Sequence, residues 1–333
     1  MQGIKKKGPI DWFITSWRSK PLFGTAFALV VMIILQTLAL GFNFGSFGEW
    51  FSKWLTNWMN ILRNNAGVGI IALGMTFVIM TGGIALALGS PLVPVGTVDL
   101  VLSAAGPGGI LLGMGISGAP AYLIAIVIGT AFGLLLGMLT GFIITKGKIP
   151  AFIATLGTMK MCRSVTQYFM QGRSPKVPKG FLNIASFEIG GQLLMPIIYW
   201  ALLAVVFHII SKKTALGRQI IAVGSNERAA GLSGINVQRV KRTVYTIIGV
   251  MVALSAILQV SRIGSMDYAN AGNGYEMDAI SSVVVGGTSM SGGKGSILGT
   301  VLGTLIIAVV NNLLNLLGVP PFLREAFKGF IVV

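Results

Sequence analysis

The chain has 333 residues, of which 54% are hydrophobic and only 10% are charged, and its formal net charge is +16. Soluble domains carry about 25% charged residues, so this composition, with a mean hydropathy of +0.82, predicts a polytopic membrane protein. The lysines and arginines cluster between apolar runs without an aromatic-rich basic surface, so nucleic acid is not expected as a partner.

The first apolar run covers residues 21–42 and follows a basic segment, residues 1–20. The run is long enough to cross a bilayer, and no convincing small-residue cleavage site follows it, so we expect a retained helix. The next segment, Trp50 to Met59, places aromatic residues at helical spacing. This pattern predicts a separate helix lying in the membrane interface.

Nine more apolar runs are separated by helix breakers and charges. The predicted spans after the first cover residues 66–84, 86–106, 119–145, 150–172, 193–211, 243–262, 276–291, 296–317 and 322–333. The predicted fold class is therefore an all-α, polytopic transmembrane helical bundle of about ten spans, with one transmembrane domain over residues 21–333.

Basic residues indicate the orientation of these spans. If residues 1–20 are cytoplasmic, six crossings return the basic segment 212–242 to the cytoplasm, as the positive-inside rule requires. Lys146, Lys148 and Lys294 also fall inside, whereas Arg173, Lys176 and Lys179 fall outside. The segment 212–242 contains Lys212, Lys213, Arg218, Arg228, Arg239, Lys241 and Arg242.

Two glycine-rich segments interrupt the apolar pattern. One is TGGIALALGS at residues 81–90, and the other is GGTSMSGGKGS at residues 286–296. The second fails the phosphate-loop pattern, because Thr288 stands at the first glycine position and Gly295 follows Lys294. We expect both to break helices within or beside the membrane, in two related halves; ordinary tight turns are the alternative. The glycines at these breaks are Gly82, Gly83, Gly286, Gly287, Gly292 and Gly293.

A second glycine pattern predicts close helix packing. Small residues every four positions let two helix backbones approach each other along one face. Gly299 and Gly303 repeat this four-residue spacing near the C-terminus. The main stripe consists of Gly129, Gly133, Gly137 and Gly141.

The sequence offers little for catalysis or metal binding. It has one cysteine, Cys162, and one histidine, His208. The GxGxxG match at residues 113–118 lacks the acidic residue that a dinucleotide site needs about 20 positions later. We therefore expect no catalytic residue, metal site or bound cofactor on this chain.

The polar segment 215–242 is too long for a simple connection, and from Asn226 onward it resembles a short helix. Asn226 can cap this helix, Glu227 suits its positive end, and small residues supply a partly apolar face. Such a helix fits a groove on a partner; a solvated loop is the alternative. The candidate docking residues are Gly224, Asn226, Glu227, Arg228, Ala229, Ala230, Leu232 and Gly234.

Four stretches together resemble one known family. They are the segment just described, GKIPAFIATLGTM at residues 147–159, GNGYEMDAISSVVVGGTSMSGGKGS at 272–296 and NNLLNLLGVPPF at 311–322. From about Asn60 onward the chain resembles the ribose-type permease subunits of bacterial ATP-binding-cassette sugar importers. The resemblance implies about ten helices in the bacterial cytoplasmic membrane and transport of a simple sugar. The chain itself would hydrolyse no ATP.

The same resemblance implies the partners. A cytoplasmic ATPase would hold ATP and magnesium and dock on segment 212–242, an extracytoplasmic binding protein would deliver the sugar, and a second permease copy or homologue would complete the pathway. Membrane lipid surrounds the bundle. One departure affects specificity, because Ala85 stands where the family usually has aspartate and Ala87 where it usually has serine.

Neutral sugars need hydrogen bonds, so hydroxyl and amide side chains are candidates for the pathway. They can equally bond one helix to another. A proton-driven secondary transporter is the rival hypothesis, but it needs an intramembrane carboxylate, and Asp99, Glu276 and Asp278 are expected near span ends. A passive channel is a weaker third hypothesis. The pathway candidates are Thr155, Thr158, Asn311, Asn312 and Asn315.

Overall fold

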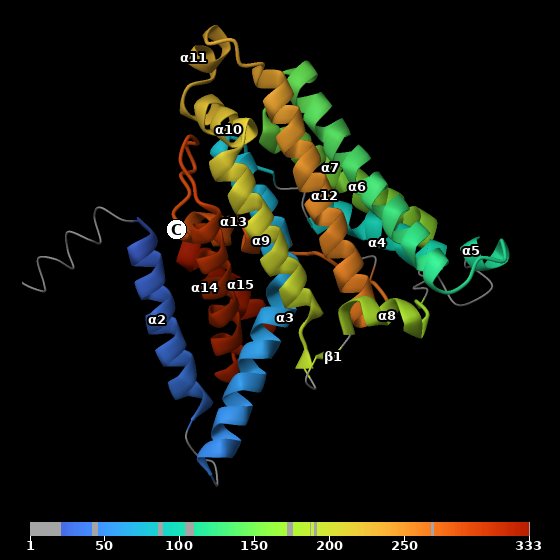
Figure 1. The fold of residues 1–333 in the computed structure, drawn as a ribbon, viewed down its shortest axis with the longest axis vertical. Coiled ribbons are helices and arrows are strands. Elements are labelled where there is room, and N and C mark those ends of the chain that lie inside the picture. The colour runs from blue at the N-terminus through green and yellow to red at the C-terminus, as the bar shows by residue number, and fades with distance from the viewer. Residues whose placement is uncertain are drawn as a thin grey trace, which may run out of the picture.

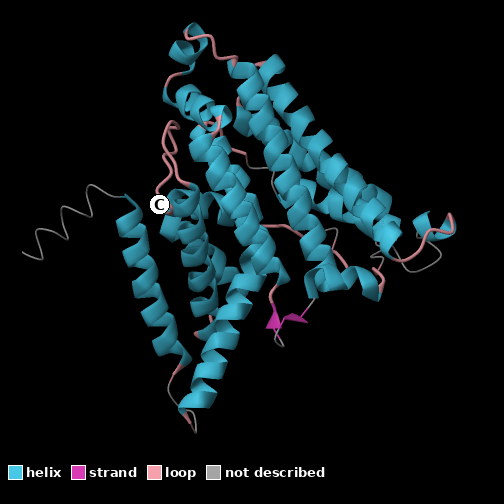
Figure 2. Cartoon of the chain, in the orientation of Figure 1, coloured by secondary structure: helices cyan, strands magenta, loops and turns pink. Residues whose placement is uncertain are grey.

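The computed structural model describes residues 21–41, 46–85, 89–103, 110–171, 176–186, 188–189, 192–267 and 270–332, so the predicted cytoplasmic segment 1–20 lies outside the described residues. Helices dominate the described chain, and loops together with one antiparallel pair of two-residue strands connect them (Figure 2). The elements in chain order are α2 (Pro21–Leu40), α3 (Phe47–Met80), α4 (Gly89–Ser103), α5 (Ile110–Gly113), α6 (Ala119–Gly147), α7 (Ala151–Met170), α8 (Lys179–Ser186), β1 (Glu188–Ile189), β2 (Gln192–Leu193), α9 (Met195–Lys213), α10 (Ala215–Ser225), α11 (Glu227–Leu232), α12 (Val237–Ile263), α13 (Tyr275–Val285), α14 (Ile297–Leu316) and α15 (Pro321–Val332).

Six helices in the described residues are long and apolar enough to cross a membrane: α2, α3, α6, α9, α12 and α14. The other predicted spans correspond to α4, α7, α13 and α15, which are shorter or less apolar. The all-helical membrane fold is therefore confirmed, whereas the count of ten spans is not established by helix length and composition.

The predicted interfacial helix is not separate. Residues 47–80 form one continuous helix of 34 residues, about 51 Å long at 1.5 Å per residue. No glycine or proline separates Met59 from Ala66, and the side-chain amide of Asn65 donates to the Ile61 carbonyl one turn earlier, at 2.8 Å. The aromatic side chains pack toward α2: the Trp54 indole donates to the Thr37 hydroxyl at 3.1 Å.

The predicted glycine stripe of α6 packs closely against another helix. α6 packs mainly against α12, and all four stripe glycines are buried. A Cβ on Gly133 would lie 2.6 Å from the Cβ of Ala253, and one on Gly137 would lie 3.0 Å from the Cα of Gly249. The sequence-based prediction of tight packing is confirmed, because only hydrogen atoms fit between these backbones.

A second glycine contact joins α13 to α14. A Cβ on Gly303 would lie 2.8 Å from the amide nitrogen of Gly286, and one on Gly299 would overlap the Gly286 carbonyl. α14 is also tied to α3, since the hydroxyls of Thr76 and Thr300 are 2.6 Å apart. Gly286, one of the glycines predicted to break a helix, therefore also allows α13 and α14 to pack closely.

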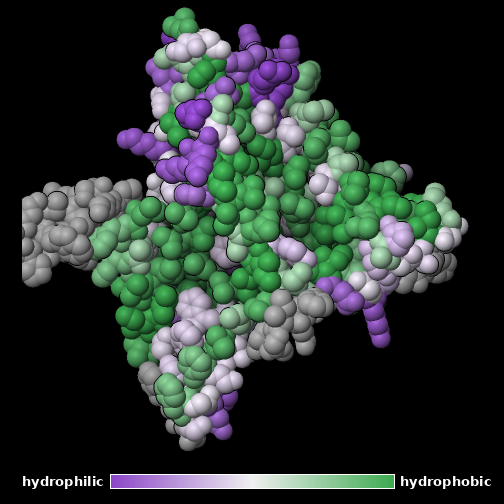
Figure 3. Space-filling view, in the orientation of Figure 1, coloured by the Kyte–Doolittle hydropathy of each residue, from purple (hydrophilic) through white to green (hydrophobic). Residues whose placement is uncertain are grey.

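The basic residues of segment 212–242 lie at one end of the molecule, together with Lys146 and Lys148 at the end of α6. The C-terminal ends of α6 and α9 and the start of α12 lie at the same end of the molecule as α10 and α11 (Figure 1), and hydrophilic side chains concentrate there (Figure 3). At the opposite end of α12, the Val177 amide donates to the carbonyl of Gly264 at 3.0 Å. Lys176 and Lys179 therefore lie at the far end from Arg239 and Arg242, as the predicted orientation requires.

The segment 212–242 contains more helix than expected. α9 continues to Lys213, α10 occupies residues 215–225, and α12 already begins at Val237. The Thr214 hydroxyl accepts from the Gly217 amide at 3.3 Å and so caps α10. This local capping signal precedes an amphipathic stretch that the sequence-based interpretation took for a loop.

Candidate coupling and translocation sites

The short helix predicted from Asn226 onward is present as α11. The Asn226 side-chain oxygen accepts from the Ala229 amide at 3.0 Å, which is the predicted N-cap. The carboxylate of Glu227 also bonds the ammonium of Lys241 in α12, at 2.7 Å. The sequence-based interpretation assigned Glu227 to the helix dipole and missed this ion pair, because Lys241 lies on another helix.

α11 projects from the basic end of the molecule (Figure 1). Leu232 is 91% exposed, whereas Ala230 is 5% exposed. The expected apolar face is therefore divided, because Ala230 packs inward while Leu232, Ala229 and Arg228 face outward. Gly234, with φ of +83°, then turns the chain back toward α12.

The two predicted glycine breaks meet each other at the end of α10. The Gly293 amide donates to the Met80 carbonyl, the last residue of α3, at 2.9 Å. A Cβ on Gly292 would lie 2.9 Å from both the Gly82 nitrogen and the Gly224 oxygen, and one on Gly224 would overlap the Met80 carbonyl. We call this contact of residues 80–83, 224–225 and 289–295 the glycine junction.

Backbone conformation explains the residue type at this junction. Gly82, Gly292 and Gly293 have φ values of +75°, +82° and +74°, which residues with a Cβ rarely adopt. Gly224 has an ordinary helical conformation but no room for a side chain. Segment 286–296 thus packs on α3 and α10, which accounts for its glycines without a bound nucleotide.

Four of the five predicted pathway residues, Thr155, Thr158, Asn312 and Asn315, bond to their own or neighbouring helices. The side-chain oxygen of Asn311 is buried and has no partner among the described residues. Thr155 and Thr158 are 1% and 8% exposed, and the Thr158 hydroxyl donates to the Thr155 carbonyl at 2.9 Å. On α14, Asn312 pairs with Asn57 of α3 at 3.2 Å, and Asn315 accepts from Arg324 at 3.0 Å.

The two sets of candidates also lie apart in the bundle. α7 packs on α4 and α6, whereas α14, which also carries Asn311, packs on α2, α3, α9 and α13. The structure does not bring the two sets into one site, and their role in translocation stays a prediction.

Residues 57–333 match the model of the family described as branched-chain amino acid transport system / permease component. The chain belongs to this permease family. The permease is 39% identical over 312 residues to the ribose import permease protein RbsC of Escherichia coli K12, covering 92% of this chain and 89% of that one. It is 42% identical over 282 residues to RbsC of Bacillus subtilis, covering 83% and 82%.

Two other matches extend the comparison. The permease is 34% identical over 277 residues to the galactofuranose transporter permease protein YtfT of E. coli, covering 83% of this chain and 77% of that one. Its fold also resembles a solved inward-facing putative metal-chelate type ABC transporter, with a TM-score of 0.51, 16% identity and coverage of 93% and 95%. Family membership favours a permease subunit over the proton-driven alternative.

A polar stripe on α7 of the permease was missed by the sequence-based interpretation. Lys160, Ser164 and Gln167 lie four and three residues apart, on one face, and all are exposed. Charged groups inside membrane proteins face water or other protein rather than lipid. The spacing is visible in the sequence, but the predicted pathway residues Thr155 and Thr158 lie on the opposite, buried face of the helix.

The carboxylates of the permease differ from expectation in one respect. Asp278 lies in the first turn of α13, near a span end as predicted. Asp99 lies one turn before the end of α4 but is fully buried, against Gly129 of α6. Among the described residues, no group of three or more His, Cys, Asp or Glu side chains could hold a metal ion.

Ala85, which stands where the family usually has aspartate, lies in the core of the permease. Ala85 is 2% exposed and follows the break at Gly82 and Gly83. Ala87 lies outside the described residues. An aspartate at position 85 would therefore be almost completely removed from water, which makes this substitution more than a surface change.

Proposed function

We propose that the permease carries a monosaccharide, ribose-like or another simple sugar, across the bacterial cytoplasmic membrane as one subunit of an ATP-driven importer. ATP and magnesium would be held by a separate cytoplasmic ATPase, and an extracytoplasmic binding protein would deliver the sugar. Two of its relatives are a ribose import permease and a galactofuranose transporter permease, which supports this substrate class.

The main support for this proposal is the structure of α11. It is a capped helix at the basic end of the bundle, and the side chains of Glu227, Arg228 and Leu232 are exposed. A short exposed helix with both charged and apolar groups suits a groove on a partner. We infer that the ATPase docks on α11, with Gly224, Ala230 and Gly234 supporting the helix from within.

The glycine junction connects α11, through α10, to the helices of the membrane bundle. α10 precedes α11 directly and contacts Met80 of α3 and Gly293 of the α13–α14 turn. Packed backbones without intervening side chains move as units. A displacement of α11 by the ATPase would therefore shift α3 and α14 between discrete packings that open the pathway to either side.

The connections support ten crossings. α12 runs from the basic end to Gly264, beside α8, whereas the α13–α14 turn returns to the basic end at Met80. α13 thus connects opposite ends although it is short, as broken helices in transporters do. If α4, α7 and α15 cross in the same way, these four helices and the six longer ones give the proposed ten.

The exposed polar stripe of α7 supports a second permease copy. Lys160, Ser164 and Gln167 would be costly to expose to lipid. A second copy or homologue placed against α7 would shield them and leave a polar channel between the subunits. This pathway differs from the predicted one on the buried face of α7.

The test of docking uses the Glu227–Lys241 pair. Glu227→Lys places a positive charge at the positive end of α11 and opposite Lys241, so we expect ATPase stimulation and sugar uptake in proteoliposomes to fall about tenfold or more. The double variant Glu227→Lys with Lys241→Glu restores the internal pair. If Glu227 meets the ATPase, the double variant stays impaired.

Lys213→Glu, outside α11, is the matched control and should have a small effect. Full recovery in the double variant would show that Glu227 acts only within the permease. Equal, mild effects in all three variants would mean that the segment is solvated and would remove the support for docking. The permease alone should not hydrolyse ATP in the same assay.

A further inference from the structure

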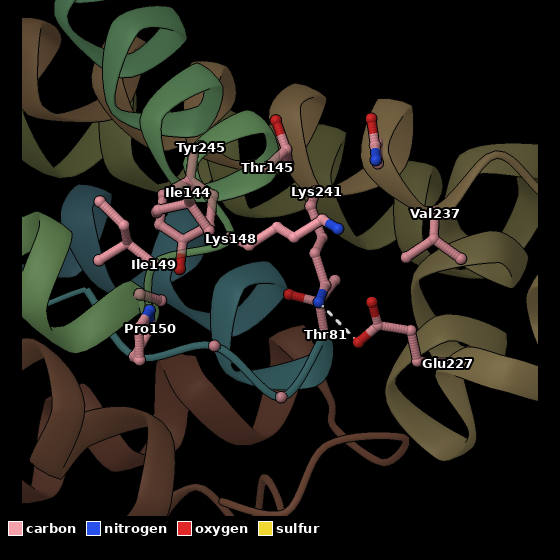
Figure 4. A pocket seen from close by; sticks show the side chains of 14 residues that line it. Thr81, Ile144, Thr145, Lys148, Ile149, Pro150, Glu227, Val237, Lys241 and Tyr245 are labelled. Carbon is pink, nitrogen blue, oxygen red and sulfur yellow. Dashed lines mark hydrogen bonds and ion pairs between the residues drawn. The ribbon is translucent and has the colours of Figure 1, made fainter.

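A cavity of about 480 Å³ lies between the bundle and α11, at the basic end (Figure 4). The end of α3, the α6–α7 turn, α11 and the first turns of α12 enclose it. Its polar lining residues include Thr81, Lys148, Glu227, Gln238, Lys241 and Tyr245. None of the functional features described above requires a space of this size here.

The N-terminus of α7 opens onto this cavity. α7 has 20 residues, begins at Ala151, and has Pro150 at its N-cap, where no described side chain caps it. The first amides of a helix have no partner within the helix, and they carry a partial positive charge that favours an anion. Pro150 and Ala151 both line the cavity.

Tyr245 points independently to a ligand. It lies on α12, is 2% exposed, and lines the cavity, where its hydroxyl lies against Gly83. Among the described residues, none gives this hydroxyl a hydrogen-bond partner. Buried hydroxyls almost always have a partner, so a free donor here indicates that an acceptor from outside the chain completes the site.

The charges around the cavity favour a negative ligand. The ammonium groups of Lys148 and Lys241 reach into the same space (Figure 4). Glu227 neutralises Lys241 at 2.7 Å, whereas no described carboxylate lies within bonding distance of Lys148. The lining therefore has two positive groups and one negative group, beside an uncapped helix N-terminus.

We propose that this cavity binds a phosphate-type anion, held by Lys148, the first amides of α7 and the Tyr245 hydroxyl. The anion is either a free phosphate or the phosphodiester of an anionic lipid headgroup, since both present the same acceptor oxygens. Lys241 would contribute at the edge of the site and share its charge with Glu227. Occupancy is thus coupled to the position of α11, and the proposal does not depend on which solute the permease transports.

Binding to the purified, full-length permease in a neutral detergent tests the proposal. One arm measures binding of radiolabelled inorganic phosphate by equilibrium dialysis, and the other measures retention of phosphatidylglycerol by native mass spectrometry. We expect saturable binding of at least one probe. Phosphate binding identifies a free anion, and retention of phosphatidylglycerol alone identifies a lipid headgroup.

The variants Lys148→Gln and Tyr245→Phe should each weaken binding about tenfold, because each removes one hydrogen bond to a charged group. Lys146→Gln is the matched control. Lys146 is exposed in the last turn of α6, two residues before Lys148, but it does not line the cavity. Melting temperatures show that the variants fold. Absence of binding by both probes, or equal binding by folded Lys148→Gln, Tyr245→Phe and Lys146→Gln variants, would overturn the proposal.

Discussion

Gly224 is a residue whose importance comes from a missing side chain. It lies in the segment predicted to contact a partner, yet it contacts the end of α3 and the α13–α14 turn. Nothing in the local sequence distinguishes it from Gly231, which lies in α11 with open space around its Cα. The two glycines therefore form a natural pair for substitution.

Gly224→Ala should force the segments of the glycine junction apart, at a cost of about 1–3 kcal/mol of overpacking. We expect lower thermal stability and a marked loss of ATPase stimulation by loaded binding protein in proteoliposomes. Gly231→Ala is the control for stability: it should keep the melting temperature and slightly favour the helix. A Gly224→Ala permease with the ATPase stimulation of the unsubstituted permease would show that the glycine junction transmits no motion.

Ala85→Asp tests the departure from the usual family residue. The sequence alone predicts altered uptake with intact assembly, but burial at 2% exposure adds a desolvation cost for the carboxylate. We now expect both altered uptake and a lower melting temperature. Ala85→Ser, which adds a hydroxyl without charge, is the control; unchanged uptake of a panel of sugars by Ala85→Asp would make the position purely structural.

At the scale of helices, the glycine stripe sets how closely α6 approaches α12. The stripe was predictable because its period of four matches one helix face. The identity of the partner helix was not, because many apolar helices could pack against it. The structure pairs Gly133 and Gly137 with Gly249 and Ala253 of α12.

Gly137→Ala should therefore separate α6 from α12, since its Cβ would lie 2.5 Å from the Tyr245 carbonyl and 3.0 Å from the Gly249 Cα. We expect a loss of stability of about 1–3 kcal/mol, seen as a lower melting temperature in detergent. Gly157→Ala on α7, where nothing lies within 4 Å, should not lower it. A stable Gly137→Ala protein would mean that the two helices can move apart at little cost.

At the scale of the whole molecule, the proposed ten crossings fix which ends face the cytoplasm. In a Cys162→Ser background, Ser233→Cys after α11 should be inside and Lys179→Cys at the start of α8 outside; both positions are exposed. A membrane-impermeant maleimide added to intact cells should label position 179 and not 233. Labelling of 233 in intact cells would reverse the orientation and move the ATPase site away from α11.

The sequence by itself determined the features that depend on local periodicity and composition. Apolar run length predicted the membrane helices, Asn226 predicted the cap of α11, and glycine spacing predicted a packed face, because each signal lies within a few turns of one segment. The same local reasoning failed for α3, because the interfacial helix was predicted to end at Met59 and the next span to begin at residue 66, whereas the residues between them are helical.

Only the tertiary structure decided which distant residues meet. Met80, Gly224 and Gly293 come from three separate parts of the chain, and so do Lys148, Glu227 and Tyr245 at the cavity. Backbone contacts and cavities of this kind depend on how several helices pack at once, and the separate segments carry no shared pattern in the sequence. The membrane helices follow from local hydrophobicity, whereas the glycine junction and the cavity follow from close packing between segments far apart in the chain.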